Sequence, residues 1–98
     1  MLTDELKKYI LDFSECKYLG EIHQKIQTVL ELPDWYGQNL DALWDAITGI
    51  MYLPAEITII FQPQTTQTLQ LSDEVDKIIT VFTEAANEFG EIVLNITK

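Results

Sequence analysis

The pattern of apolar and polar positions along the chain predicts three strands and three helices. Runs rich in β-branched and aromatic residues, typical of strands, occupy residues 8–13, 56–61 and 91–97. Apolar residues recur at helical spacing over residues 18–31, 40–48 and 72–89. The run at 56–61 is almost continuously apolar, as a buried parallel strand would be. This order predicts an α/β fold with a small parallel sheet and right-handed crossovers.

Residues with special backbone or capping properties mark the expected helix ends. Pro33 should stop the first helix, and the side chain of Asn39 should cap the start of the second. Gly49 is expected to end the second helix in a left-handed conformation. For the third helix, Ser72 is the predicted N-cap and Gly90 the predicted end.

The size and composition of the chain fit one domain over residues 1–98. Apolar residues make up 47% of the sequence, which is enough to fill a core without disulfides or a structural metal. Cys16 is the only cysteine, so an intrachain disulfide and a cysteine-rich zinc site are both excluded. No apolar run is long enough to span a membrane, and no signal peptide precedes the domain. We therefore expect a cytoplasmic protein.

Acidic residues dominate the charge. Six lysines face sixteen aspartates and glutamates, which gives a net charge of −10. Such a protein repels nucleic acids and anionic membranes, and it attracts basic proteins. No Lys, Arg or His occurs over residues 26–76. The acids of this stretch are Glu31, Asp34, Asp41, Asp45, Glu56, Asp73, Glu74 and Asp76. A field of one sign over half of a domain indicates a cationic partner.

The helix at residues 40–48 has an apolar face and an acidic face. Its predicted core positions are Leu40, Leu43 and Ile47. Its neighbouring face carries Asp41, Trp44, Asp45 and Thr48. Carboxylates at i and i+4 repel each other by a few tenths of a kcal/mol, and no nearby lysine relieves them. Aromatics beside paired acids are typical of protein interfaces. The same residues also fit a solvated helix with core tryptophans.

The segment LPDWYGQNLDALWDAITG, residues 32–49, strongly resembles the signature of the barstar family of ribonuclease inhibitors. Weaker similarity extends over the strand KKYILDF, the helix that contains His23, and the run VFTEA at residues 81–85. The resemblance therefore covers almost the whole chain. It implies a three-stranded parallel sheet with helices packed around it, in agreement with the order of elements predicted from the apolar pattern.

The resemblance also implies a function, that of an intracellular antidote or immunity protein against a secreted, basic, barnase-like ribonuclease. In the family, the acidic helix and the loop before it enter the active-site cleft of the enzyme. Asp45 matches the aspartate that replaces a substrate phosphate, and Asp41 matches a second carboxylate of the same contact. The other positions that match interface residues are Trp35, Trp44, Thr48, Gly49 and Glu84. We expect a monomer that binds one nuclease and uses no cofactor.

Three departures from the family pattern concern the target. Trp35 replaces a tyrosine that packs on the catalytic histidine of the enzyme in the best-known members, and it lacks the phenol hydroxyl. Ile50 stands where a tryptophan is common, and the Gln/Thr-rich residues 62–70 differ in length and composition. The resemblance therefore predicts the fold and the acidic helix more closely than the identity of the nuclease.

The sequence shows no set of residues for catalysis or metal binding. His23 has no second His or Cys at ligand spacing, and Cys16 has no histidine partner, so both are expected to be structural. The pairs Asp41/Asp45 and Glu84/Glu88 protrude side by side, unlike the facing carboxylates of glycosidases. An enzyme is therefore not expected. The alternative function is an acidic interaction or regulatory domain of barstar-like fold that binds a different basic partner.

Overall fold

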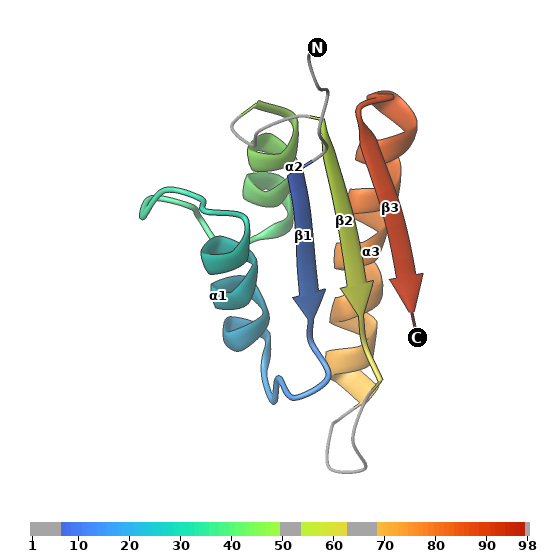
Figure 1. Cartoon of the computed structure of the whole chain (residues 1–98). Helices are drawn as coiled ribbons and strands as arrows, with labels where there is room; N and C mark the ends of the chain where they lie inside the picture. Colours follow the sequence, from blue (N-terminus) through green and yellow to red (C-terminus); the bar gives the residue numbers. More distant parts are fainter. Residues whose placement is uncertain (1–6, 50–53, 63–68, 98) are drawn as a thin grey trace.

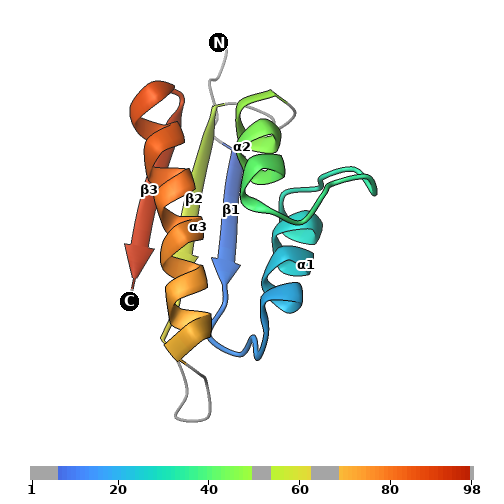
Figure 2. The ribbon, with the colours of Figure 1, turned by 180° about the vertical axis from the view of Figure 1, so that it is seen from behind.

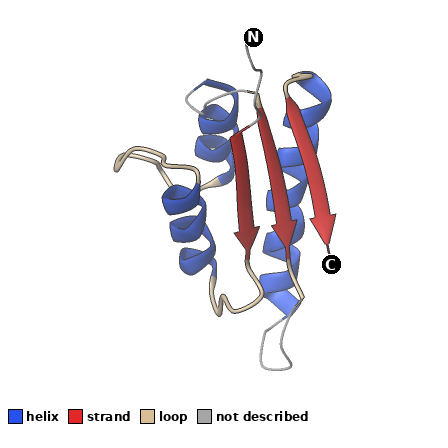
Figure 3. Cartoon of the chain, viewed as in Figure 1, coloured by secondary structure: helices blue, strands red, loops and turns tan. Residues whose placement is uncertain are grey.

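The computed structural model describes residues 7–49, 54–62 and 69–97 of the chain. Its elements are β1 (Lys7–Asp12), α1 (Leu19–Val29), α2 (Leu40–Gly49), β2 (Ala55–Ile60), α3 (Leu69–Glu88) and β3 (Ile92–Thr97). The strands form one parallel sheet in the order β1-β2-β3. The predicted α/β class, the parallel sheet and the order of elements are confirmed. Figure 3 shows the three strands side by side with the helices beside and behind them.

Side chains on the sheet alternate between a buried face and an open face. In the register of the sheet, Tyr9 of β1 lies next to Ile57 of β2, which lies next to Leu94 of β3. Tyr9 and Ile57 are buried, and Leu94 packs against the core. In β2 every second residue is fully buried and the residues between are half-buried. The nearly continuous apolar character of this strand therefore reflects burial on one face, with partial cover on the other.

The helices lie on one side of the sheet. Seen from behind, α3 and α2 lie in front of the strands, while α1 flanks the outer edge of β1 (Figures 1 and 2). No described helix covers the opposite face (Figure 3). On that face the side-chain amide of Asn95 donates to Glu56 Oε2 at 2.9 Å and to Thr58 Oγ1 at 3.4 Å. Cross-strand polar bonds thus satisfy a face that parallel sheets usually cover with a second helical layer.

The observed helix ends agree with the predictions only in part. Asn39 caps α2 as predicted, because its Oδ1 accepts the N–H of Ala42 at 2.8 Å. The prediction for Ser72 is wrong: α3 begins at Leu69, and the buried stripe of this helix already includes Leu71. Gly49 and Gly90 do not adopt the left-handed conformation, since no described glycine has a positive φ. Most of the Gln/Thr-rich segment 62–70, namely residues 63–68, lies outside the described residues, and residues 69–70 belong to α3.

The helix α3 supplies much of the core. Its buried stripe is Leu71, Val75, Ile78, Phe82 and Ala85. These positions recur at helical spacing and face the sheet and α2.

No described helix has both the length and the apolar character that crossing a membrane requires.

One polar side chain, His23 of α1, lies among the buried residues of the described chain. It is 3% exposed, and its Nδ1 lies 2.8 Å from the hydroxyl of Tyr36. Burial lowers the pKa of His23 below its usual value of 6.5, although the charge of Glu74 on α3 acts in the opposite direction. The expectation that His23 is structural agrees with this position in the core.

We expect the loss of stability on truncating a strand isoleucine to depend on which face of the sheet the side chain occupies. Ile57→Ala removes a fully buried side chain and should lower the free energy of unfolding by about 2–5 kcal/mol. Ile10→Ala, on the open face where Ile10 is 62% exposed, should lower it by less than about 1 kcal/mol. Urea unfolding of the two variants measures both values, and equal losses would contradict the assigned faces.

We also expect His23 to make stability depend on pH. The unfolded chain protonates His23 near its usual pKa of 6.5, whereas the folded protein keeps it neutral to lower pH. The free energy of unfolding should therefore fall as the pH decreases from about 7.5 to 5. His23→Asn, which does not titrate, should show a flatter profile over this range. Asp12, whose pKa is lowered by its hydrogen bonds with Ser14, acts only at lower pH. Identical profiles for the two proteins would exclude the assignment.

Candidate protein-binding site

The connection between α1 and α2 projects from the body of the molecule (Figures 1 and 2). Its central part, residues 33–37, contains a turn in which the N–H of Tyr36 donates to the carbonyl of Pro33 at 3.0 Å. Glu31 and Gln38 flank this turn with φ values of 57° and 54°. Both conformations are rare for residues that carry a Cβ atom, so other contacts must hold the 33–37 loop in its shape.

The helix α2 is fixed to the core along one side. Leu43, Ala46 and Ile47 are buried, whereas Leu40, which was predicted to face the core, is 36% exposed. The buried residues of α2 thus include Ala46, which was not predicted, and not Leu40. The cap by Asn39 satisfies the N–H of Ala42, while the carbonyl of Asn39 accepts the N–H of Leu43 at 2.9 Å. A helix held in this way presents its outer side chains on a rigid frame.

The outer side of α2 carries the two predicted carboxylates. Asp41 and Asp45 are both exposed, and neither forms an ion pair with a described residue. The ion pairs of the described chain are Lys7–Glu31 and Lys77–Glu74. The first turn of a helix favours an acid such as Asp41, but the mutual repulsion of the two carboxylates remains without a neighbouring cation.

A pocket of about 220 Å³ lies between the 33–37 loop and α2. Its lining residues are Pro33, Trp35, Tyr36, Gly37, Ala42, Asp45 and Ala46. The lining is mainly apolar, with one carboxylate, and Trp35 is 73% exposed. A Cβ atom on Gly37 would lie 3.2 Å from the Cβ of Ala42, so the glycine allows the loop to approach the helix closely. The structure thus brings Trp35 and Asp45 to one concave site.

The other predicted site residues do not line this pocket. Trp44 is half-buried and packs against the core, and Thr48 Oγ1 donates to the carbonyl of Trp44 at 2.8 Å. Gly49 is exposed, and a Cβ atom there would meet nothing within 4 Å. Glu84 is exposed on α3. These four residues lie outside the lining of the pocket that Trp35 and Asp45 share. Ile50, one of the three departures from the family pattern, lies outside the described residues.

The apolar half of the pocket was not predicted from the sequence. Tyr36 entered only as one residue of the signature at 32–49, yet it is buried and lines the pocket. Ala42 and Ala46 were not singled out. Because Ala42 and Ala46 are small and lie one helical turn apart on either side of Asp45, they leave room for a partner side chain. This spacing of small residues is the sequence signal that could have predicted the pocket.

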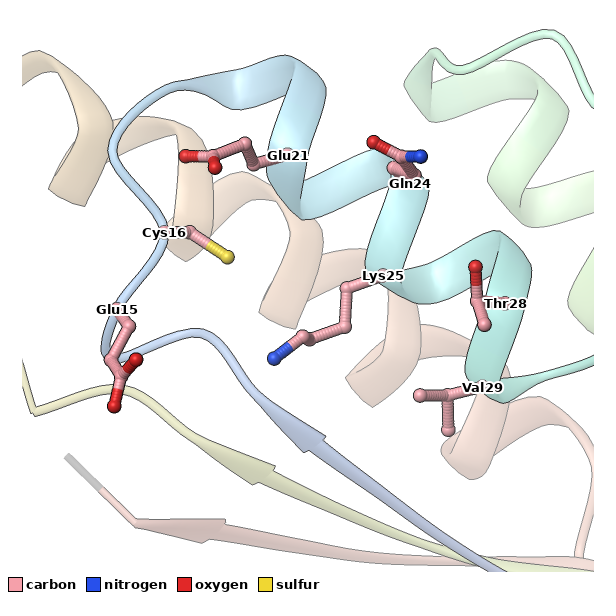
Figure 4. A pocket seen from close by; sticks show the side chains of 7 residues that line it. All are labelled: Glu15, Cys16, Glu21, Gln24, Lys25, Thr28 and Val29. Carbon is pink, nitrogen blue, oxygen red and sulfur yellow. The ribbon is translucent and has the colours of Figure 1, made fainter.

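A second pocket, of about 420 Å³, lies along α1 (Figure 4). Its lining residues are Glu15, Cys16, Glu21, Gln24, Lys25, Thr28 and Val29. Several of its polar groups serve the local fold: Glu21 accepts the N–H of Lys17 at 2.6 Å, and Lys25 donates to the carbonyl of Asp12 at 3.0 Å. Burial raises the pKa of the Cys16 thiol, which disfavours the reactive thiolate. This pocket therefore lacks the features of a reactive site.

Metal chemistry has no support in the described ranges. Residues 7–49, 54–62 and 69–97 contain no group of three His, Cys, Asp or Glu side chains that could hold a metal ion. The exposed acids of α2 point outward from one helix instead of converging on a point.

Comparisons with known proteins agree with this geometry. A family model described as "Barstar (barnase inhibitor)" matches residues 6–96. A protein of Bacillus subtilis (strain 168), named "Putative ribonuclease inhibitor YrdF", is 32% identical to the chain over 86 residues. That match covers 88% of this chain and 92% of the relative. Both findings point to an inhibitor rather than an enzyme. The chain therefore belongs to the barstar family.

Proposed function

We propose that this protein inhibits a basic, barnase-like ribonuclease by placing α2 and the 33–37 loop in the active-site cleft of the enzyme. The observation that carries the proposal is the position of Asp45, an exposed carboxylate without an ion-pair partner among the described residues, at a pocket shared with Trp35. The family and the relative support inhibition of a ribonuclease as the general role.

Asp45 would act in place of a substrate phosphate. A ribonuclease must hold its phosphate with cationic side chains, and a carboxylate forms charge-assisted hydrogen bonds with the same groups. The carboxylate offers no bond that the enzyme can cleave. Because Leu43 and Ile47 fix α2 to the core, little conformational freedom is lost when Asp45 binds. Asp41, one turn earlier, would add a second contact to the same cationic cluster.

The pocket next to Asp45 suits a flat cationic side chain. The exposed ring of Trp35 offers a π-face, and the Asp45 carboxylate offers a negative charge at the same site. Imidazolium and guanidinium groups bind favourably to both. An enzyme histidine or arginine that enters this pocket would be withdrawn from catalysis.

The remaining residues would form the edge of the contact. The hydroxyl proton of Thr48 is directed to the carbonyl of Trp44, so the hydroxyl oxygen can accept a bond from the enzyme. Gly49 lies in open space, and the absence of a side chain lets a partner approach the end of α2. Glu84 on α3 would add attraction at longer range. The complex would contain one inhibitor monomer and one enzyme.

This function would be exercised in the cytoplasm, before the nuclease leaves the cell or when a competitor's nuclease enters. The protein would then serve as an antidote or as an immunity protein. Mixing it with a purified barnase-like ribonuclease tests the proposal directly. Unchanged RNA cleavage with the inhibitor in excess would refute it and would favour the alternative, an acidic domain for another basic partner.

We expect Asp45→Ala to weaken binding to the ribonuclease by about 2–5 kcal/mol, because enzyme cations would be left buried and unpaired. The free energy of unfolding should change by less than about 0.5 kcal/mol, since Asp45 is exposed. Asp73→Ala, an exposed acid on α3, is the matched control and should leave the affinity nearly unchanged. Calorimetric titration and urea unfolding measure both quantities. Loss of stability with unaltered affinity would refute the role of Asp45.

The association rate should depend strongly on salt. With a net charge of −10 on the inhibitor and a basic enzyme, long-range attraction accelerates encounter. Raising NaCl from about 0.05 to about 0.5 M shortens the screening length and should slow association at least about tenfold. Stopped-flow measurements give the rate. An association rate that is independent of salt would exclude electrostatic capture.

A further inference from the structure

Two residues of α1, His23 and Gln27, form hydrogen bonds with the 33–37 loop. The Nδ1 of His23 lies 2.8 Å from the hydroxyl of Tyr36, and the two rings are tilted with centroids 5.9 Å apart. One turn later, Gln27 Nε2 donates to the carbonyl of Pro33 at 2.9 Å. The carbonyl of Gln27 accepts the N–H of Leu32 at 2.9 Å. Positions 23 and 27 lie on the same face of the helix, so both ends of the turn are tied to it.

The hydroxyl of Tyr36 and Nδ1 of His23 share one hydrogen bond, and the tautomer of the imidazole sets which of the two donates. Burial raises the pKa of Tyr36 to about 12, so its hydroxyl stays protonated at neutral pH. A phenylalanine would fill the same apolar space as Tyr36 without needing a polar partner. The hydrogen bond with His23 thus fixes the orientation of the Tyr36 side chain, which apolar packing alone would not do.

We infer that His23 and Gln27, here called the loop anchor, are positioning residues for partner binding. They act through Tyr36 and Pro33, two residues that line the pocket beside α2. By fixing these two residues, the loop anchor sets Trp35 opposite Asp45 and keeps the pocket open before the partner arrives. The inference rests on the proposed function for the identity of the partner, but the restraint itself acts in the free protein.

The need for an anchor follows from the strain of the loop. Glu31 and Gln38 hold positive φ values at its two ends, a conformation that costs a residue with a Cβ atom free energy. Trp35 is mostly exposed and gives the loop little packing. Without the loop anchor, the loop would sample other conformations, and binding would have to restore the correct one. The lost pre-organisation appears as weaker affinity.

A double-mutant cycle with the ribonuclease separates positioning from a merely structural role. Tyr36→Phe removes only the hydroxyl and should raise the Kd about tenfold. In a Trp35→Ala background, where the loop presents no aromatic ring, the same change should raise the Kd less than about twofold. His23→Asn keeps a hydrogen-bonding group near the position of Nδ1, so it should lose less affinity than His23→Leu. Gln27→Ala should resemble Tyr36→Phe.

Two further variants of α1 are the controls. Ile26→Val trims a fully buried side chain of the same helix, so it lowers stability without touching the loop anchor. Gln24→Ala changes an exposed residue that lines the pocket of Figure 4. Neither should change the Kd by more than about twofold. An equal loss on Tyr36→Phe in both Trp35 backgrounds, or an equal loss on Ile26→Val, would overturn the inference.

Hydrogen exchange in the free protein tests the loop anchor without any partner. The amides of Leu32 and Tyr36 donate within the loop region, to Gln27 and Pro33. In Tyr36→Phe they should exchange at least about tenfold faster, while the amide of Leu43 in α2 keeps its rate. Unchanged exchange at Leu32 and Tyr36 would refute the anchor even if the wild-type protein inhibits no ribonuclease. Failure of inhibition with accelerated exchange would instead refute only the proposed partner.

Discussion

The packing of one side of α2 against the core is the constraint on which the functional surface depends. Leu43, Ala46 and Ile47 are buried, so the rotation of the helix is fixed and Asp45 must face outward. Repulsion between Asp41 and Asp45 is small beside the free energy of burying these apolar side chains. The core can therefore hold an acidic surface that an isolated helix would disfavour. The buried apolar residues and the exposed acids therefore lie on opposite sides of the same helix.

The apolar periodicity predicted the order of the elements because burial sets it directly. Strands with buried alternate residues and helices with buried stripes were located to within a few residues. Helix ends were less predictable, since they depend on what lies beyond them. Ser72 has the chemistry of a cap, but burial of Leu71 extends α3 past it. Gly49 has the conformational freedom for a left-handed end, yet α2 includes it without a positive φ.

The sequence placed the outer residues of the candidate site more readily than the inner ones. Trp35 and Asp45 were predicted from their types and from the family signature, and the structure places both at one pocket. The contribution of Tyr36 depends on its contact with His23, a residue thirteen positions earlier in the chain. No local pattern encodes such a contact, because it arises only when α1 and the loop meet in three dimensions. The roles of Trp35 and Asp45 in binding remain predictions.

The open face of the sheet has a consequence for how such a protein can change over generations. The side chain of Asn95 donates there to Glu56 and to Thr58, and no described helix covers this face. In the proposed complex the helix that meets the partner is α2, whose acids Asp41 and Asp45 are exposed. Substitutions on the exposed side of α2 can follow a drifting target while the sheet keeps its residues. The exposed side of α2 can thereby diversify without changes in the sheet.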